Sequence, residues 1–188
     1  MLGGFLLKGK HMKIIKSLLL FAVLGIGAAA TVMYSGVVDV AADEPHGDLV
    51  YWFLEETREN SIKKSAQAIE VPDLSAPELL LTGGNDYEFM CSSCHLKPGQ
   101  RESDMSVGLY PAPPNLSLFP ESHEGQEHVD AAQADRKSFW VIKHGIKASG
   151  MPAWGKTHDD ERIWAMVAFI KRLPTLTPEQ YQILTAID

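Results

Sequence analysis

The first 38 residues of this 188-residue chain contain no acidic residue. All 24 Asp and Glu residues lie at or after Asp39, with 13 of the 17 Lys and Arg residues, so this part carries a net charge of −11. A surface with such an excess of carboxylates lacks the clustered cations that neutralise phosphates. We therefore expect no nucleic-acid partner, and a surface that attracts basic proteins instead.

Cysteine is also scarce, because the chain has only Cys91 and Cys94, followed directly by His95. A disulfide, a thioredoxin-like pair and half of a zinc site share this spacing. A zinc site needs two more ligands at suitable spacing, and the sequence has no second CxxC. No βαβ pattern surrounds the pair, as a thioredoxin-like motif requires. The pentapeptide CSSCH therefore indicates one covalently attached haem c, with two thiols for its vinyl groups and His95 as an iron ligand.

Charge is absent from a run of 22 residues between Lys16 and Asp39. As a helix, this run spans the ~30 Å hydrocarbon core of a bilayer. Four lysines precede it and should stay in the cytoplasm, which places the rest of the chain in the periplasm. We predict a cytoplasmic extension over residues 1–16 and a single-pass inner-membrane anchor over residues 17–38.

A cleavable signal peptide, cut near Ala41 or Ala42, is the alternative to an anchor. We favour the anchor because signal peptides usually have a shorter apolar region, of about 7–15 residues. Both interpretations export the following domain. Met12 is an alternative start, with residues 1–11 as an upstream extension.

Residues 48–70 have the periodicity of an amphipathic helix, capped by Asp48 and ended by Val71-Pro72. Its apolar positions are Leu49, Trp52, Phe53, Ile62, Ala66 and Ile69. We expect this juxtamembrane helix to pack on the following domain or lie at the lipid interface; docking to a partner complex is the alternative. With a Pro-containing linker it makes up residues 39–77, and residues 78–188 form the haem domain.

The haem domain is predicted to be all-α, because no internal repeat and no convincing strand is present. We expect helices over residues 78–94 or 85–94, 135–144, 159–173 and 177–187. Residues 97–119, rich in Pro and Gly, should form a loop, and residues 121–133 an exposed acidic excursion. Asp159 or Thr157 is expected to cap the third helix.

From about residue 79 to residue 173, the chain resembles the class I cytochrome c family. The matching motifs are CSSCH at 91–95, PPNL at 113–116 and GMPAW at 150–154, followed by IWAMVAFI in the last long helix. They stand in the family's order. The resemblance implies an all-α fold whose first and last helices cross beside a buried haem.

The resemblance also implies the remaining haem contacts. Met151 matches the second axial ligand, and a thioether suits ferrous iron and raises the reduction potential relative to a second His. Pro114 matches the proline whose carbonyl accepts a hydrogen bond from the ligating His. From its residue type, and not from the resemblance, Trp154 is interpreted as a wall of the haem pocket that donates its indole N–H to a propionate. Met105 and His144 are the rivals of Met151.

Two protein ligands leave no open coordination position on the iron, so no catalytic residue is predicted. We expect a one-electron carrier between a cytochrome bc-type complex or periplasmic dehydrogenase and a terminal oxidase or reductase. The alternatives are a permanent electron-transfer subunit of a membrane oxidase or dehydrogenase, and a haem sensor in which Met151 is displaced.

Overall fold

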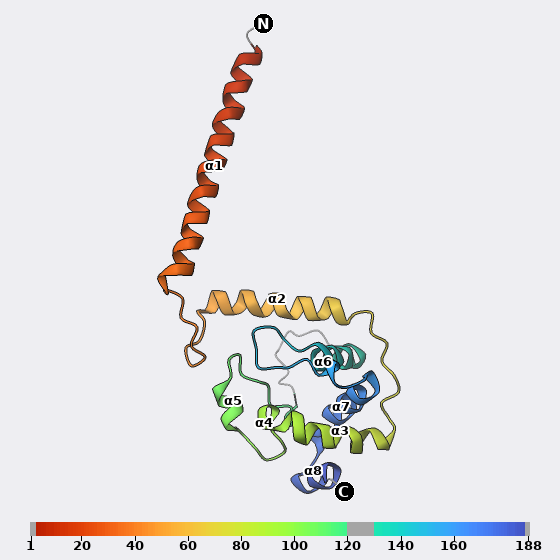
Figure 1. Cartoon of the computed structure of the whole chain (residues 1–188). Coiled ribbons are helices and arrows are strands. Elements are labelled where there is room, and N and C mark those ends of the chain that lie inside the picture. The colour runs from red at the N-terminus through yellow and green to blue at the C-terminus, as the bar shows by residue number, and fades with distance from the viewer. Residues whose placement is uncertain (1–2, 120–129, 187–188) are drawn as a thin grey trace. The chain divides into compact units, whose positions relative to one another are not determined.

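The computed structural model describes residues 3–119 and 130–186, and regular structure in these ranges is entirely helical (Figure 1). This confirms the predicted all-α class. The chain divides into two compact units, Met1–Glu44 and Pro45–Asp188. The first contains one long helix, and the second contains the shorter helices together with the CSSCH, PPNL and GMPAW motifs.

The first unit is built on α1 (Gly3–Ser35). Its 25-residue stretch His11–Ser35 is long and apolar enough to cross a membrane, and no other helix in the described ranges is. The helix ends before Gly36, whose φ of +67° is a conformation that glycine adopts without steric cost.

The second unit contains seven α-helices and two 3-10 turns in its described residues. They are α2 (Asp48–Ala66), α3 (Pro77–Met90), α4 (Ser92–His95), α5 (Asp104–Gly108), α6 (Ala131–His144), η1 (Trp154–Lys156), α7 (Asp160–Arg172), η2 (Leu173–Thr175) and α8 (Pro178–Thr185).

The core of this unit forms where α3 crosses α7. Gly83 makes the crossing close, because a Cβ atom there would collide with the carbonyl group of Ala165 on α7. Tyr87 and Phe169 are both fully buried beside this point, with ring centroids 5.4 Å apart. The predicted crossing of the first and last long helices is confirmed, and the structure adds that a glycine lies at the contact.

The ends of α7 and α8 follow from their capping residues. Asp159 accepts a hydrogen bond from the backbone N–H of Arg162, and Lys171 and Arg172 lie in the last turn of α7, where cations are favourable. Thr177 forms a capping box with Gln180 at the start of α8. Asp159, rather than Thr157, is therefore the cap of α7.

Three predicted segments differ from the structure. Gly47, not Asp48, is the N-cap of α2. The helix ends at Ala66, and Ile69 turns onto the core. The carbonyl of Ile69 accepts a hydrogen bond from Arg136 Nε at 3.0 Å. Part of the expected 97–119 loop is α5, which a Ser103 capping box starts. Helix α6 begins four residues earlier than predicted, because Asp130 caps it. Residues 121–129 of the expected acidic excursion lie outside the described residues.

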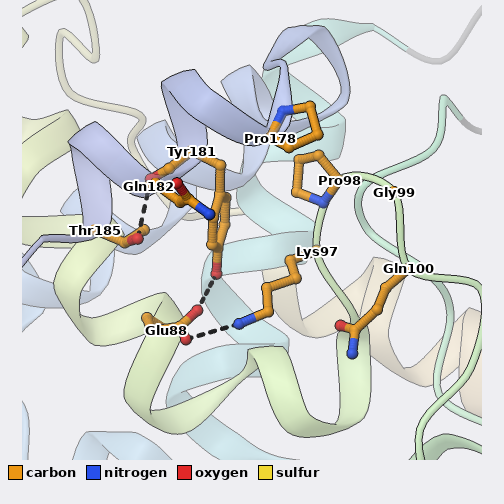
Figure 2. Close-up of a pocket in the computed structure, with 9 residues that line it drawn as sticks. All are labelled: Glu88, Lys97, Pro98, Gly99, Gln100, Pro178, Tyr181, Gln182 and Thr185. Carbon is orange, nitrogen blue, oxygen red and sulfur yellow. Dashed lines mark hydrogen bonds and ion pairs between the residues drawn. The ribbon is translucent and has the colours of Figure 1, made fainter.

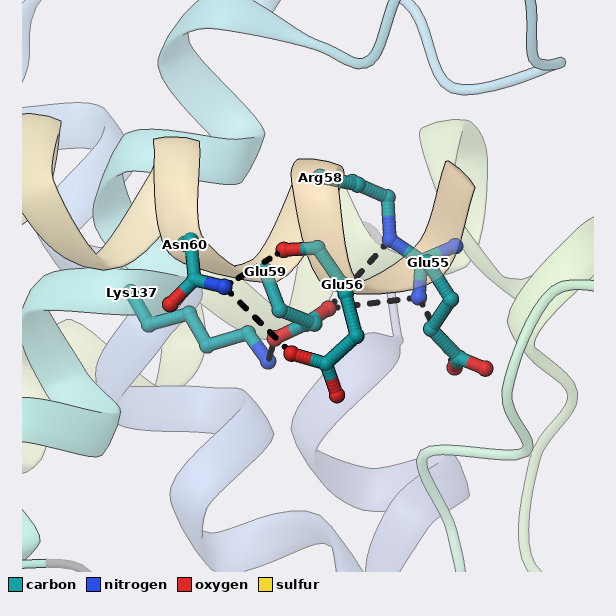
Figure 3. Close-up of polar contacts among 6 residues, drawn as sticks. All are labelled: Glu55, Glu56, Arg58, Glu59, Asn60 and Lys137. Atoms are coloured by element: carbon teal, nitrogen blue, oxygen red, sulfur yellow. Dashed lines mark hydrogen bonds and ion pairs between the residues drawn. The ribbon is translucent and has the colours of Figure 1, made fainter. Parts of the chain in front are cut away.

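The second half of α2 packs on α6. Ile62 and Ala66 are buried there, and Glu59 forms an ion pair with Lys137 of α6 (Figure 3). Arg58 pairs with Glu55 and Glu59 on α2 itself, at 3.2 Å in both cases. One end of α2 is therefore fixed to α6.

Candidate functional site

The CSSCH segment forms one helical turn that continues from α3. The backbone N–H of Cys91 donates to the carbonyl of Tyr87 at 2.9 Å, and that of His95 donates to the carbonyl of Cys91 at 2.8 Å. Residues three apart in a helical turn share one face, so Cys91 and Cys94 present their sulfurs to the same side. Both thiols are unpaired.

The environment of Cys91 differs from that of a redox-active cysteine. Its side chain is buried, and this burial, with smaller contributions from Asp86 and Cys94, raises the pKa of the Cys91 thiol to about 12. Thioredoxin-like pairs instead have a cysteine whose pKa is lowered so that it is a thiolate near neutral pH. A buried thiol that keeps its proton is a poor nucleophile, which does not suit dithiol–disulfide exchange.

The His95 ring is oriented by the loop that carries the PPNL motif. Its Nδ1 lies 2.9 Å from the carbonyl oxygen of Pro114. Because a carbonyl only accepts, Nδ1 must carry the proton, and Nε2 keeps its lone pair for a metal. Burial lowers the pKa of His95 and so favours the neutral ring. The hydrogen bond to Pro114 acts in the opposite direction, but the pKa stays below its usual value.

The hydroxyl of Tyr87 is a contributor to the site that the sequence analysis missed. It donates to the carbonyl of Leu96 at 2.6 Å and lies 3.2 Å from that of His95. Leu96 has a φ of +66°, a conformation rare for a residue with a side chain. Burial raises the pKa of Tyr87, so the phenol remains a donor. Tyr87 thus holds the backbone just after His95 in its unusual conformation.

Met151 lies in a tight loop between α6 and η1. Its N–H donates to Ser149 Oγ at 3.1 Å, and its carbonyl accepts from the N–H of Ile146 at 3.2 Å. Gly150 leaves room for Leu109, because a Cβ atom would lie 2.8 Å from that side chain. The partly buried Met151 side chain packs on an apolar cluster of α6 and α7 that Met90, the neighbour of Cys91, also contacts.

These donors fit a haem c. They comprise two thiols on one side of a helical turn, an imidazole nitrogen held in the metal-binding tautomer and a thioether on a braced loop. A bare metal ion fits less well, since the described ranges contain no group of three His, Cys, Asp or Glu residues suited to hold one.

Comparison with known proteins agrees with this geometry. Residues 78–170 match the family described as cytochrome c oxidase, cbb3-type, subunit III. This segment is a class I c-type cytochrome domain. The match spans about half of the chain, from the first turn of α3 to the last turn of α7, and excludes α1, α2 and α8. The searches of curated proteins and of solved structures gave no match.

The other residues predicted for the cytochrome site occupy different surroundings. Trp154 begins η1, packs on the same apolar cluster as Met151 and contacts the His158 ring edge-on at 5.6 Å. Met105, a rival ligand, lies in α5 and is exposed. His144, the other rival, ends α6 with its ring 5.0 Å from that of Trp140. Of these three, Trp154 shares the neighbours of Met151.

Helix α8 contacts the cytochrome domain through a polar cluster of Glu88, Lys97 and Tyr181. Glu88 of α3 accepts from Tyr181 of α8 at 2.5 Å and from Lys97 at 2.9 Å (Figure 2). Burial alone would raise the pKa of Glu88, but these hydrogen bonds outweigh it and lower that pKa below its usual value. Helix α8, although outside the family match, therefore braces the segment on both sides of His95.

Proposed function

We propose that this protein is a membrane-anchored, periplasmic cytochrome that carries single electrons on one haem c. In this proposal Cys91 and Cys94 would form the thioethers, and His95 and Met151 would be the two protein ligands of the iron. The observation that carries it is the His95 ring, with Nδ1 held by Pro114 and Nε2 left for a metal, directly beside two unpaired cysteines.

The bound haem would supply a reversible one-electron couple at its iron. The protein's residues determine how that couple is used. Pro114 fixes the His95 ring and the braced loop presents Met151, so the chain would supply both protein ligands of the iron. Without an open position for oxygen or substrate, such a site transfers electrons and does not catalyse bond formation.

The helix α1 supplies the proposed anchor. Lys8, Lys10, Lys13 and Lys16 precede or begin its apolar stretch, and the positive-inside rule assigns this end to the cytoplasm. The cytochrome domain would then work in the periplasm, close to the inner membrane. Anchoring raises its effective concentration at membrane-bound redox partners.

The net charge of −11 after residue 38 favours partners with basic docking surfaces. We propose a cytochrome bc-type complex or a periplasmic dehydrogenase as electron donor. A terminal oxidase or reductase would be the acceptor.

A second candidate function is a permanent subunit of a membrane oxidase, and the matching family, described by such a subunit, favours it. Extraction in a mild detergent separates the two proposals. A permanent subunit elutes with the oxidase activity at the mass of a complex, whereas a carrier elutes alone.

Haem content tests the proposal directly. The purified holoprotein should keep its pigment after acid-acetone denaturation and contain one haem per chain by pyridine haemochrome spectroscopy. The C91A/C94A double variant should lose pigment in the same extraction. Rapid carbon monoxide binding to the reduced parent protein at neutral pH would count against the carrier and favour a sensor.

A further inference from the structure

The first two turns of α2 expose large apolar side chains. Leu49, Trp52 and Phe53 have 75%, 58% and 60% of their surface exposed, more than the other apolar residues of these turns. Their i, i+3, i+4 spacing places them on one face of the helix. We call these three residues the apolar stripe. Exposed contiguous apolar surface of this kind usually marks an interaction site.

The stripe stands on a fixed support. At the far end of α2, Ile62 and Ala66 are buried and Glu59 pairs with Lys137 of α6. At the near end, the N–H of His46 donates to the Tyr110 hydroxyl at 3.1 Å. Helix α2 is therefore held to the cytochrome domain at both ends, and the domain presents the stripe in one orientation.

The chain itself indicates what covers the stripe. Only residues 36–47 separate the proposed membrane helix α1 from α2, so the stripe lies within about 45 Å of chain from the membrane. Trp, Phe and Leu are the residue types that form the apolar face of helices lying in the lipid interface.

Polar residues limit the apolar surface to these two turns. Glu56 and Asn60 continue the stripe along the same face of α2, and the Asn60 amide donates to the Glu56 carbonyl at 2.9 Å (Figure 3). These residues are exposed and suit water or lipid headgroups. The face thus changes from apolar to polar along the helix axis, as expected where a helix enters an interface by one end.

We propose that the apolar stripe inserts into the headgroup–acyl boundary of the membrane that α1 spans. This inference rests on the proposed anchor. Insertion would give the cytochrome domain a second attachment to the bilayer, and because α2 is fixed to α6, it would orient the haem-binding face relative to the membrane.

The test uses the full-length holoprotein in vesicles of phosphatidylethanolamine and phosphatidylglycerol. An environment-sensitive NBD fluorophore is attached at Phe53→Cys, at Ser65→Cys as a control at an exposed position in the second half of α2, and at Leu24→Cys inside α1. Quenching by doxyl-labelled lipids reports lipid contact, and quenching by iodide reports water. Label uptake by the parent protein is measured first, because thioether-bound Cys91 and Cys94 should take up none.

The proposal expects the Phe53 fluorophore to be quenched by doxyl lipids with loss of iodide quenching, and the Ser65 fluorophore to show the reverse. Iodide quenching at both positions would overturn it. Shielding of Phe53 from both quenchers would also overturn it, in favour of a protein partner or a second copy. The Leu24 fluorophore tests the anchor separately. Lipid contact at Leu24 together with water contact at Phe53 would support the anchor and contradict insertion of the stripe.

Discussion

At the residue scale, the hydroxyl of Tyr87 can be removed without disturbing the packing of its ring. Tyr87→Phe keeps the ring between α3 and α7 but leaves the Leu96 carbonyl without its 2.6 Å donor. A buried acceptor left unsatisfied costs about 1–3 kcal/mol. We expect that loss in the free energy of unfolding by denaturant titration of the holoprotein. Tyr51→Phe, at an exposed position, should stay within about 0.5 kcal/mol of the parent.

A second residue-scale prediction concerns the ion pair between Asp86 and Arg162. Arg162 donates from Nε and Nη2 to the two carboxylate oxygens of the buried Asp86, at 2.6 and 2.5 Å. Arg162→Met leaves that carboxylate unpaired, so we expect destabilisation by about 1–3 kcal/mol. Adding Asp86→Asn should restore part of the loss, because it removes the unpaired charge. A double variant as unstable as the sum of both single variants would contradict this pairing.

Local sequence information predicted the site residues that have a motif, and not those that act through the backbone. CSSCH, PPNL and GMPAW are recognisable because each requires particular residue types at adjacent positions. The Tyr87 hydroxyl instead contacts carbonyls eight and nine residues away. The only sequence signal is that a tyrosine, and not a phenylalanine, lies at a core position four residues before Cys91. A buried hydroxyl needs a hydrogen-bond partner, but the sequence does not say which.

At the element scale, the close crossing of α3 and α7 depends on Gly83. Gly83→Ala places a methyl group against the Ala165 carbonyl, and only backbone movement can relieve the clash. We expect a loss of about 1–3 kcal/mol in the free energy of unfolding. Gly108→Ala is the matched control, because its Cβ would meet nothing within 4 Å. Equal stability of the two variants would show that the crossing is looser than described.

Because α8 docks through the carboxylate of Glu88, the stability of the fold should depend on pH. The pKa of Glu88 is lowered in the folded protein, so its contribution is present above the ordinary value near 4.5 and is lost as the pH falls through the lowered one. The thermal midpoint of the parent should fall over this range. Glu88→Gln and Tyr181→Phe should both show a shallower fall. Parallel curves for all three proteins would contradict the cluster.

Helix boundaries were predictable where a cap and the hydrophobic period agree, as at Asp159 in α7 and Thr177 in α8. They were not predictable where tertiary contacts decide. Helix α2 stops at Ala66 because Ile69 turns onto the core and its carbonyl meets Arg136, which lies 67 positions along the chain. No local pattern records that contact.

At the scale of the whole molecule, an apolar helix, a helix buried only in its second half and a compact cytochrome domain follow one another along the chain. This order is consistent with the proposed anchoring at the membrane, while the braced Met151 loop and the Pro114–His95 contact serve the proposed ligation. The account therefore depends on Met151, and not Met105, being the sulfur on the iron.

The most direct measurement is the absorption spectrum of the oxidised holoprotein in the region of the methionine-to-iron charge-transfer band. We predict that the parent shows the band, that Met151→Ala abolishes it and lowers the reduction potential, and that Met105→Ala leaves both unchanged. A band that survives in Met151→Ala, or disappears in Met105→Ala, would contradict the central claim.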